Sequence, residues 1–345
     1  MAETKKPPSS IDVARLAGVS QSAVSRSFTP GACVSAQTKA KVMAAAEALG
    51  YRPNIIPRIM LTNRSNIVAV VVGSLSNPYH TKALEAFSRT LQDAGKQVML
   101  VQSDSERALN EVVGQLAGYR VDAVVSALEI VSPKVTAAID QMRIPVVTLN
   151  SALTSAWSGT ITSDNEAAGE RIARLLYARG GRRFGYIAGP ADSLSQRQRE
   201  TGFRRGLAAV GISECALAQG DYRHSGGYAA ARALFSGDPF PDAVFCANDL
   251  TAFGMIDALR TEFGLSVPKD VLVAGYDNVE AAAWPAYDLT TFDQQIDEMV
   301  GLAVDMVNGE WTGGAPKTIA PVLVERASTG GAGWGGNSNS RRVTA

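Results

Sequence analysis

A short segment near the start of the chain carries side chains whose chemistry suits nucleic acid. Val24 and Phe28 are spaced i and i+4, so they define the inward face of a helix that begins after Ser20. The outward face then carries amide, hydroxyl and guanidinium groups, namely Gln21, Ser22, Ser25 and Arg26. Groups of these types read base edges and hold phosphates. The segment therefore predicts a surface that reads DNA.

Two short helices joined by a turn at Gly18 would position these side chains. The first helix can turn Val13, Ala14 and Leu16 inward. Ser20 is a good N-cap for the second helix, because its hydroxyl can accept a hydrogen bond from a backbone N–H that the first turn leaves free. The outward residues of the second helix would then lie on a surface fixed by the first.

A third helix is expected from Val34-Ser35 to Leu49-Gly50, with a serine as its cap and a glycine as its stop. Together the segments predict a helix-turn-helix DNA-binding unit, although similar helix pairs also pack inside ordinary helical domains. The run from Asp12 to Asn54 closes on Leu49-Gly50-Tyr51-Arg52-Pro53-Asn54. Without a gap, it resembles the headpiece of the LacI-type (lactose repressor/galactose repressor) family of transcriptional regulators. The resemblance implies that this segment binds DNA.

The charge distribution favours an anionic partner at one end of the chain. The 345 residues hold 33 lysines and arginines and 33 aspartates and glutamates, so the formal net charge is zero. Residues 1–64 hold nine basic and three acidic side chains, which leaves the rest of the chain with a surplus of six acidic ones. A basic segment on an acidic body suits an anionic polymer. The alternative, a solvated run of charge, is weaker because these charges flank the DNA-reading helix.

The connector after the third helix resembles the hinge helix of the same family. In relatives this segment folds when two subunits sit on DNA and inserts an apolar side chain into the minor groove, and Met60 falls at that position here. The alternative is that Met60 packs against the body. Pro57 replaces the usual alanine, but with Asn54 as cap it lies in the first turn, where no internal N–H bond is lost. The residues predicted to contact DNA are Ser20, Gln21, Ser22, Ser25, Arg26, Thr29, Asn54, Arg58 and Met60.

From Asn66 onward, apolar runs alternate with helical stretches. Continuous apolar runs are typical of strands covered on both faces. They occur at Ile67–Val72, Val98–Val101, Ala123–Val125, Val146–Leu149, Phe184–Ala188, Ala243–Cys246 and Val271–Ala274. The helical stretches between and after them include Thr81–Ala94, Asn165–Arg179, Arg199–Val210, Leu250–Phe263 and Gln294–Asn308. Such alternation predicts parallel sheets with helices on both sides.

A series of motifs in the body resembles the sugar-binding periplasmic-protein fold that this family carries behind its headpiece. They include Asn77-Pro78-Tyr79, Ser163-Asp164-Asn165, Ala247-Asn248-Asp249, Gly275-Tyr276-Asp277-Asn278 and Leu289-Thr290-Thr291. The expected fold is an all-α helix-turn-helix headpiece joined by a hinge to an α/β body of two parallel-sheet, periplasmic-binding-protein-like subdomains. The expected domains are a headpiece at 1–53, a hinge helix and linker at 54–65, an effector-binding and dimerisation domain at 66–326, and a disordered tail at 327–345. The body is expected to split near residue 163 and to cross back near residue 292.

Polar side chains follow most of the predicted strands, and ligands of open parallel sheets collect outside the carboxyl ends of the strands. The rule and the resemblance nominate a cleft lined by Asn77, Tyr79, Asp104, Asn150, Ser193, Arg199, Tyr222, Asn248, Asp249, Asp277 and Trp284. Carboxylates and amides beside aromatic faces suit a sugar or another small polyol. Alternatives stay open for three of these residues. Asp249 could cap the next helix, Trp284 could be a lid or part of the core, and Arg199 could serve the carboxylate of a sugar acid.

Two other classes of protein fit the sequence less well. An enzyme would need a nucleophile beside a base and an orienting acid, and neither His80 nor His224 has such neighbours in sequence. A transport binding protein would share the body fold but would need a signal sequence and no headpiece. The expected function is therefore a sequence-specific transcription regulator, in the first place a repressor, controlled by a small molecule bound between the subdomains. A non-sugar ligand and activation of some promoters stay open.

The remaining expectations concern cofactors, location and assembly. Cys33, Cys215 and Cys246 lie far apart without metal-type spacing, which indicates a reducing cytosol and neither disulfides nor a zinc site. No cofactor or metal is expected. Without a signal-like segment or an apolar run long enough for a bilayer, the expected location is the cytoplasm and no membrane partner is expected. The expected partners are a pseudo-palindromic double-stranded operator, a sugar-like effector, and a second copy in a homodimer.

Overall fold

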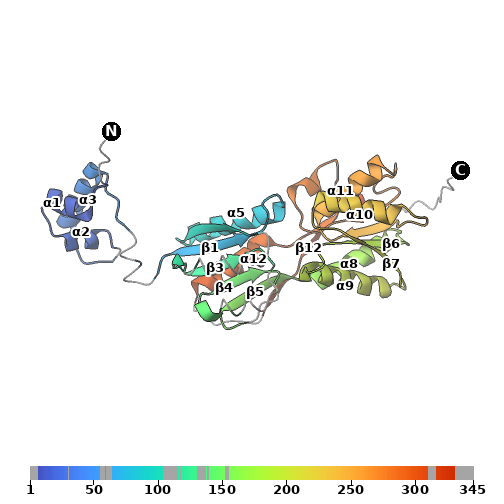
Figure 1. Ribbon diagram of the computed structural model, residues 1–345, viewed down its shortest axis with the longest axis horizontal. Helices are drawn as coiled ribbons and strands as arrows, with labels where there is room; N and C mark the ends of the chain where they lie inside the picture. The colour runs from blue at the N-terminus through green and yellow to red at the C-terminus, as the bar shows by residue number, and fades with distance from the viewer. Residues whose placement is uncertain are drawn as a thin grey trace. The chain divides into compact units, whose positions relative to one another are not determined.

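The computed structural model describes residues 7–29, 31–54, 59, 64–103, 116, 118–129, 137, 140–151, 155–309 and 316–330. The chain divides into two compact units, Met1–Ser65 and Asn66–Ala345, whose helices and strands Figure 1 labels. Each unit has its own apolar core. The two units are therefore taken one at a time below.

The described residues of the N-terminal unit form three helices: α1 (Ser10–Ala17), α2 (Gln21–Ser27) and α3 (Ala36–Leu49). Their ends confirm the expected caps. Ser20 and Ser35 each accept a hydrogen bond from a backbone N–H in the first turn of α2 and α3. Gly18 and Gly50 end α1 and α3 with φ angles of 65° and 63°. Glycine enters this left-handed region without the steric cost that a Cβ atom adds.

A small apolar core holds these three helices together. Val13, Val24 and Val42, one from each helix, are fully buried in it. The expectation that Leu16 also faces inward is wrong, because this residue is 57% exposed. Ala17, four residues after Val13 and on the same helical face, packs against the core instead.

The larger unit contains two parallel sheets. Among the described residues, the first sheet has six strands in the order β11-β5-β4-β3-β1-β2, and every neighbouring pair is parallel. These strands are β1 (Ile67–Val72), β2 (Gln97–Gln102), β3 (Ala123–Ser126), β4 (Val146–Leu149), β5 (Ser158–Ser163) and β11 (Lys317–Ile319). Helices α5 (Pro78–Asp93) and α12 (Ile296–Asn308) pack on this sheet through a shared core that includes Phe87 and Met299.

The second sheet has the order β7-β6-β8-β9 in the described part of the chain and is also parallel. Its strands are β6 (Phe184–Ala188), β7 (Cys215–Gln219), β8 (Ala243–Cys246) and β9 (Leu272–Ala274). Its helices are α8 (Asn165–Ala178), α9 (Leu194–Ala208), α10 (His224–Phe235) and α11 (Asp249–Thr261). Tyr186 packs with α8 and α9, whereas the next residue, Ile187, packs with α10 and α11. Because successive strand residues point to opposite faces, helices cover this sheet on both sides.

The chain passes between the two subdomains three times within the described residues. It leaves the first sheet after β5, returns with α12, and leaves again after β11. The second and third passages run side by side, because β10 (Thr291–Asp293) and β12 (Val322–Val324) form an antiparallel pair. Figure 1 shows β12 where the two subdomains meet.

The end of the body lies later than the sequence predicted. The expected disordered tail from residue 327 is wrong for its first residues, since Ala327–Thr329 form the 3-10 helix η2 with Ser328 and Thr329 buried. The hydroxyl of Ser328 donates a hydrogen bond of 2.6 Å to the carbonyl oxygen of Val273 in β9. A composition rich in small polar residues did not reveal this buried acceptor, and residues 331–345 lie outside the described part.

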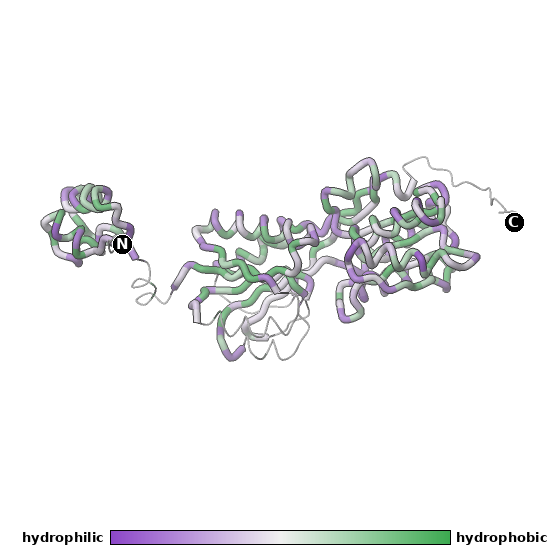
Figure 2. The backbone as a smooth tube through the Cα atoms, turned by 45° about the horizontal axis from the view of Figure 1, so that its top comes forward, coloured by the Kyte–Doolittle hydropathy of each residue, from purple (hydrophilic) through white to green (hydrophobic). Residues whose placement is uncertain are grey.

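The burial of a strand depends on whether it lies at the centre or at the edge of its sheet. The central strand β1 is fully buried from Val68 to Val72, whereas the edge strands β2 and β7 are largely exposed or half-buried. Figure 2 shows hydrophobic stretches along the strands of the body and hydrophilic ones concentrated at turns and on outer faces. No helix among the described residues is long and apolar enough to cross a membrane.

Candidate functional sites

The outward face of α2 presents the predicted DNA-reading side chains. Gln21, Ser22, Ser25 and Arg26 are all exposed, while Val24 between them is buried. The amide nitrogen of Gln21 donates a hydrogen bond of 2.9 Å to the hydroxyl of Ser10 on α1, which ties the two helices. Ser20, Thr29 and Asn54 are exposed as well. The remaining predicted DNA contacts, Arg58 and Met60, lie outside the described residues, as does Pro57.

A cavity of about 330 Å³ lies between the two subdomains of the body. Its lining comes from both subdomains and consists of Asn77, Tyr79, His80, Ala127, Leu128, Glu129, Asn150, Pro190, Asp192, Ser193, Ser195, Arg199, Tyr222, Asn248, Asp277 and Gln294. Many of these residues closely follow the carboxyl end of a strand, where parallel sheets collect ligands. Its volume is at the lower end of the range of small-molecule pockets, about 300–1,000 Å³.

The structure brings together eight of the predicted pocket residues: Asn77, Tyr79, Asn150, Ser193, Arg199, Tyr222, Asn248 and Asp277. Two others do not join them, and the position of a third is not described. Asp104 lies outside the described residues. Trp284, after the 3-10 helix η1 (Glu280–Ala283), is 52% exposed and is not part of the lining. Asp249 is fully buried behind the cavity wall.

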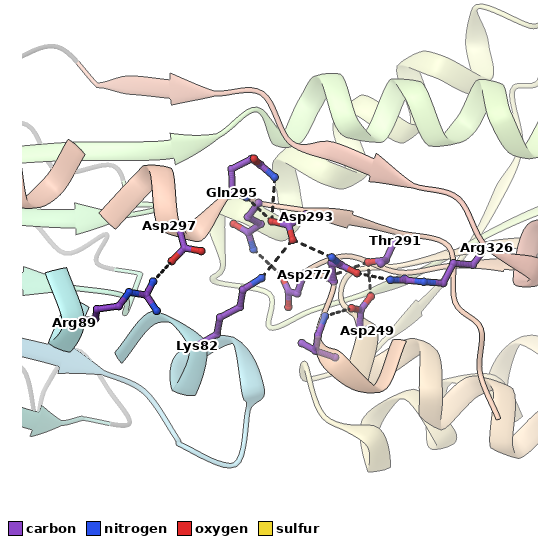
Figure 3. Close-up of polar contacts among 12 residues, drawn as sticks. Lys82, Arg89, Asp249, Asp277, Thr291, Asp293, Gln295, Asp297 and Arg326 are labelled. Atoms are coloured by element: carbon purple, nitrogen blue, oxygen red, sulfur yellow. Dashed lines mark hydrogen bonds and ion pairs between the residues drawn. The ribbon is translucent and has the colours of Figure 1, made fainter. Parts of the chain in front are cut away.

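Asp249 stabilises the loop that carries Asp277 and does not reach the cavity. Its carboxylate accepts hydrogen bonds from the backbone N–H of Val279 at 2.9 Å and from the hydroxyl of Thr291 at 2.6 Å (Figure 3). The cap of α11 is the preceding residue, Asn248, which accepts from a backbone N–H in the first turn. Burial raises the pKa of Asp249, and Asp277 raises it further. Its placement behind the wall makes it a support of the site.

Arg199 is the only cation among the cavity-lining residues that the structure describes, and it is held on three sides. Its Nε atom donates to the side chain of Asn165 at 2.8 Å, and one terminal nitrogen donates to the carbonyl oxygen of Ala247 at 2.5 Å. Its guanidinium carbon lies 3.6 Å from the ring centroid of Tyr276. Burial alone would lower the pKa of Arg199, but the neighbouring tyrosines and Asp277 raise it above its usual value. The guanidinium is therefore a fixed positive charge.

A chain of hydrogen bonds joins the two walls of the cavity. The amide nitrogen of Asn150 donates to the hydroxyl of Tyr79 at 3.1 Å and to the amide oxygen of Gln294 at 2.8 Å. The nitrogen of Gln294 in turn donates to the carboxylate of Asp277 at 2.6 Å. Gln294 belongs to the passage between β10 and α12. A residue of the crossover thus connects the first subdomain to the second.

A second polar series also links the two subdomains, and Figure 3 labels its members Lys82, Asp293 and Arg326. Lys82 on α5 lies 3.4 Å from the carboxylate of Asp293, which also accepts a hydrogen bond of 2.9 Å from the side chain of Asn278. The oxygen of Asn278 accepts from Arg326 at 2.8 Å. The series connects α5 of the first subdomain, both crossover strands and the loop after β9.

Five polar residues of the lining escaped the sequence analysis: His80, Glu129, Asp192, Ser195 and Gln294. Glu129 follows the predicted strand at Ala123–Val125, but no residue was nominated there. Applying the strand-end rule to that strand would have found it. Gln294 follows a strand of only three residues, which has no apolar run to mark it.

The cavity offers hydroxyls, amides, carboxylates and one guanidinium, groups that bind a hydroxylated small molecule through hydrogen bonds. Among the described residues, no group of three or more histidine, cysteine or acidic side chains could hold a metal ion. Two family models match separate parts of the chain. Residues 11–54 match the family described as bacterial regulatory proteins, lacI family, and residues 173–329 match a periplasmic binding protein-like domain.

Full-length relatives decide the family. The ribose operon repressor of Escherichia coli strain K12 is 30% identical over 325 residues, which cover 92% of this chain and 98% of the relative. The chain belongs to the lacI family. The regulator CelR of Thermobifida fusca is 31% identical over 323 residues, covering 90% of this chain and 95% of CelR. This lacI-family protein is a DNA-binding transcription regulator and not an enzyme.

Solved structures of the lacI family superpose over nearly the whole chain. The lac repressor dimer bound to its operator and an anti-inducer has a TM-score of 0.85 at 26% identity, covering 94% of this chain and 99% of that one. A complex of CelR with cellobiose has a TM-score of 0.70 at 29% identity, covering 93% and 99%. The expected fold class, a helix-turn-helix headpiece with an α/β body of parallel sheets, is therefore confirmed.

Proposed function

We propose that the protein is a repressor that binds a pseudo-palindromic operator as a homodimer and responds to a sugar or sugar-like metabolite. The observation that carries the proposal is the cavity in which Gln294 joins Asn150 of one subdomain to Asp277 of the other. A ligand seated there contacts both walls and favours one relative arrangement of the subdomains. A ligand shifts such an equilibrium only through its different affinities for the two states.

The relatives support each part of this proposal. One solved relative is a dimer on operator DNA and another holds cellobiose, and the ribose operon repressor aligns over nearly its whole length. The exposed face of α2 supplies the reading surface, with two copies placed about one helical turn apart on a symmetric site. A regulator of genomic DNA works beside that DNA, so we propose a cytoplasmic location.

Selection of genomic fragments by the purified protein tests the operator part. We expect recovery of one pseudo-palindromic sequence, and the genes beside it name the metabolites to assay. Retention of fragments without a common sequence, both alone and with pooled metabolites, would contradict the proposal. In that case the binding would report only the basic surplus of residues 1–64.

The variant Arg199→Ala tests the effector part. Removing the guanidinium takes away the fixed charge of the cavity, so we expect loss of the effector response with operator binding retained. The measurement is operator affinity with and without the metabolite. Arg204→Ala is the matched control, because Arg204 lies on the same helix, is 41% exposed, and pairs with Glu200 outside the cavity. An intact response in Arg199→Ala would remove this residue from the site.

A further inference from the structure

The carboxylate of Glu129 crosses the cavity and binds the beginning of α9. Glu129 follows β3 in the first subdomain, whereas α9 belongs to the second. One carboxylate oxygen accepts hydrogen bonds from the backbone N–H groups of Leu194 and Ser195, the latter at 3.1 Å. The other accepts from the hydroxyl of Ser193 at 2.8 Å. The first turn of a helix leaves N–H groups free and favours a negative charge, and here a side chain of the opposite subdomain supplies it.

Glu129 is part of the cavity wall. Ser193, which Glu129 contacts, also shares a hydrogen bond of 2.8 Å with the hydroxyl of Tyr222, and all three residues line the cavity. The three donors leave Glu129 well bonded, and yet burial raises the pKa of its carboxyl above the usual value. The three donors hold the carboxylate in place against that burial, so an anionic ligand would meet it at short range.

Acidic side chains outnumber basic ones in the described lining of the cavity. Among the described residues, three carboxylates, from Glu129, Asp192 and Asp277, face one guanidinium, from Arg199. Asp277 and Arg199 each favour the charged form of the other. Asp192 is exposed to solvent. Among the described lining residues, the one cation for an anionic ligand is Arg199, which already lies beside Asp277, and the start of α9 is already occupied by Glu129.

We propose that Glu129 determines the charge class of the effector: it occupies the anion-binding end of α9 itself, so the cavity admits uncharged polyhydroxylated molecules and rejects their acids and phosphate esters. The inference rests on the proposed function and decides between the sugar and the sugar acid that the sequence left open. A purely structural role, as a cap of α9, would make Glu129 matter for stability but not for the sign of the ligand's charge.

Inorganic phosphate tests the assignment without knowledge of the effector. We expect calorimetry to show no binding of phosphate to the wild-type protein at millimolar concentration. In Glu129→Ala the start of α9 is free, so phosphate should bind at least ten-fold more tightly than to the wild type. The double variant Glu129→Ala/Ser193→Ala should lose part of this gain, because it lacks one of the three donors.

Two further variants keep the test decisive. Glu129→Gln retains the shape and an acceptor oxygen but removes the charge, and it serves if Glu129→Ala does not fold. Glu200→Gln is the control, because it removes the same charge from α9 itself, at a position outside the cavity lining. Folded variants of Glu129 that gain no phosphate binding would overturn the proposal, as would a gain of equal size in Glu200→Gln.

The wild-type protein gives an independent readout. Thermal shifts are measured with D-ribose and D-glucose, and with ribose 5-phosphate, gluconate and glucose 6-phosphate. We expect any shift to come from the neutral sugars, and an acid or phosphate ester that binds more tightly than its parent sugar would overturn the proposal. Operator binding is scored separately, so failure of the charge assignment leaves the regulator function standing and the reverse also holds.

Discussion

At Asp277, burial and the neighbouring charges act in opposite directions on one carboxyl group. Burial raises its pKa, Arg199 and the hydrogen bond from Gln294 lower it, and burial prevails, so that the pKa rises from 3.8 to about 6. The backbone at Asp277 is also strained, with φ of 116°, a value that residues with a Cβ atom rarely adopt. A buried carboxyl group on a strained backbone lowers stability, and such groups are typical of ligand-binding sites.

The raised pKa of Asp277 predicts how stability depends on pH. Between about pH 4 and pH 6 the folded state holds more protons than the unfolded state, so the free energy of unfolding falls as pH rises through this window. The variant Asp277→Asn carries an amide that cannot titrate, and it should therefore lack this fall. The stability of the variant relative to the wild type should rise by up to about 3 kcal/mol from pH 4 to pH 7.

Urea denaturation of the ligand-free protein at several pH values measures this difference. Each protein is its own reference at pH 4, where the carboxyl of the wild type is protonated in the folded state. Parallel curves for the two proteins from pH 4 to pH 7 would show that Asp277 carries no raised pKa.

At the scale of elements, close helix packing holds Arg199 in place. A Cβ atom at Gly202 of α9 would lie 2.0 Å from the backbone oxygen of Glu166 on α8, and one at Gly169 of α8 would lie 2.4 Å from the backbone oxygen of Arg199. The two helices thus touch through backbone atoms. This contact brings Asn165 within hydrogen-bond distance of the Arg199 guanidinium.

Gly202→Ala is therefore expected to separate α8 from α9. The clash is with backbone and cannot be relieved by turning a side chain, so the free energy of unfolding should fall by about 3 kcal/mol. Gly301→Ala is the matched control, since a Cβ atom at this position of α12 would meet no atom within 4 Å. It should leave stability unchanged or raise it by up to about 1 kcal/mol. Chemical denaturation compares the two variants, and equal stabilities would refute the packing argument.

The same scale shows what the sequence could predict. The buried central strands β1, β3, β4, β6 and β8 are continuous apolar runs, because helices or other strands shield every side. The sequence analysis did not find β5 or β7. Strand β5 reads Ser158-Gly159-Thr160-Ile161-Thr162-Ser163, and its small polar residues mimic a loop. Strand β7 lies at the sheet edge, where exposed positions do not need apolar side chains.

Some site residues could be predicted from the sequence, and others could not. Residues placed directly after a recognised strand, such as Asn150 and Asn248, could be predicted because the topology of a parallel sheet collects strand ends. Trp284 and Asp249 could not be placed, since their exposure depends on which way a short loop turns. The contact between Glu129 and Ser193 joins residues 64 positions apart in two subdomains, and only the folded body brings them together.

At the scale of the whole molecule, the passages between the subdomains connect the cavity to the rest of the body. Gln294 and Asp293 are neighbours in the passage that returns to the first subdomain. Gln294 forms hydrogen bonds with Asn150 and Asp277 of the cavity wall. Asp293 contacts Lys82 and Asn278 in the second polar series. A change in the angle between the subdomains must therefore rearrange both sets of bonds. An effector acts at a distance through an element with two discrete arrangements, and in the proposed function these bonds are the ones exchanged between them.

In the proposed function this change reaches DNA through the connector at 54–65, and a variant at Met60 tests that step. The sequence predicts that its side chain enters the minor groove once two copies sit on an operator, where an apolar wedge unstacks a base step and kinks the duplex. Met60→Ala should keep the body folded and dimeric but weaken specific operator binding by about ten-fold or more, which is about 1.4 kcal/mol. Gel-shift assays with permuted operator fragments measure affinity and bending together.

Met43→Ala, at a methionine of α3 that is 45% exposed, controls for the loss of a surface methionine. Unchanged affinity and bending in Met60→Ala would mean that the connector only tethers the headpiece, and that effector control of operator binding must travel by another contact.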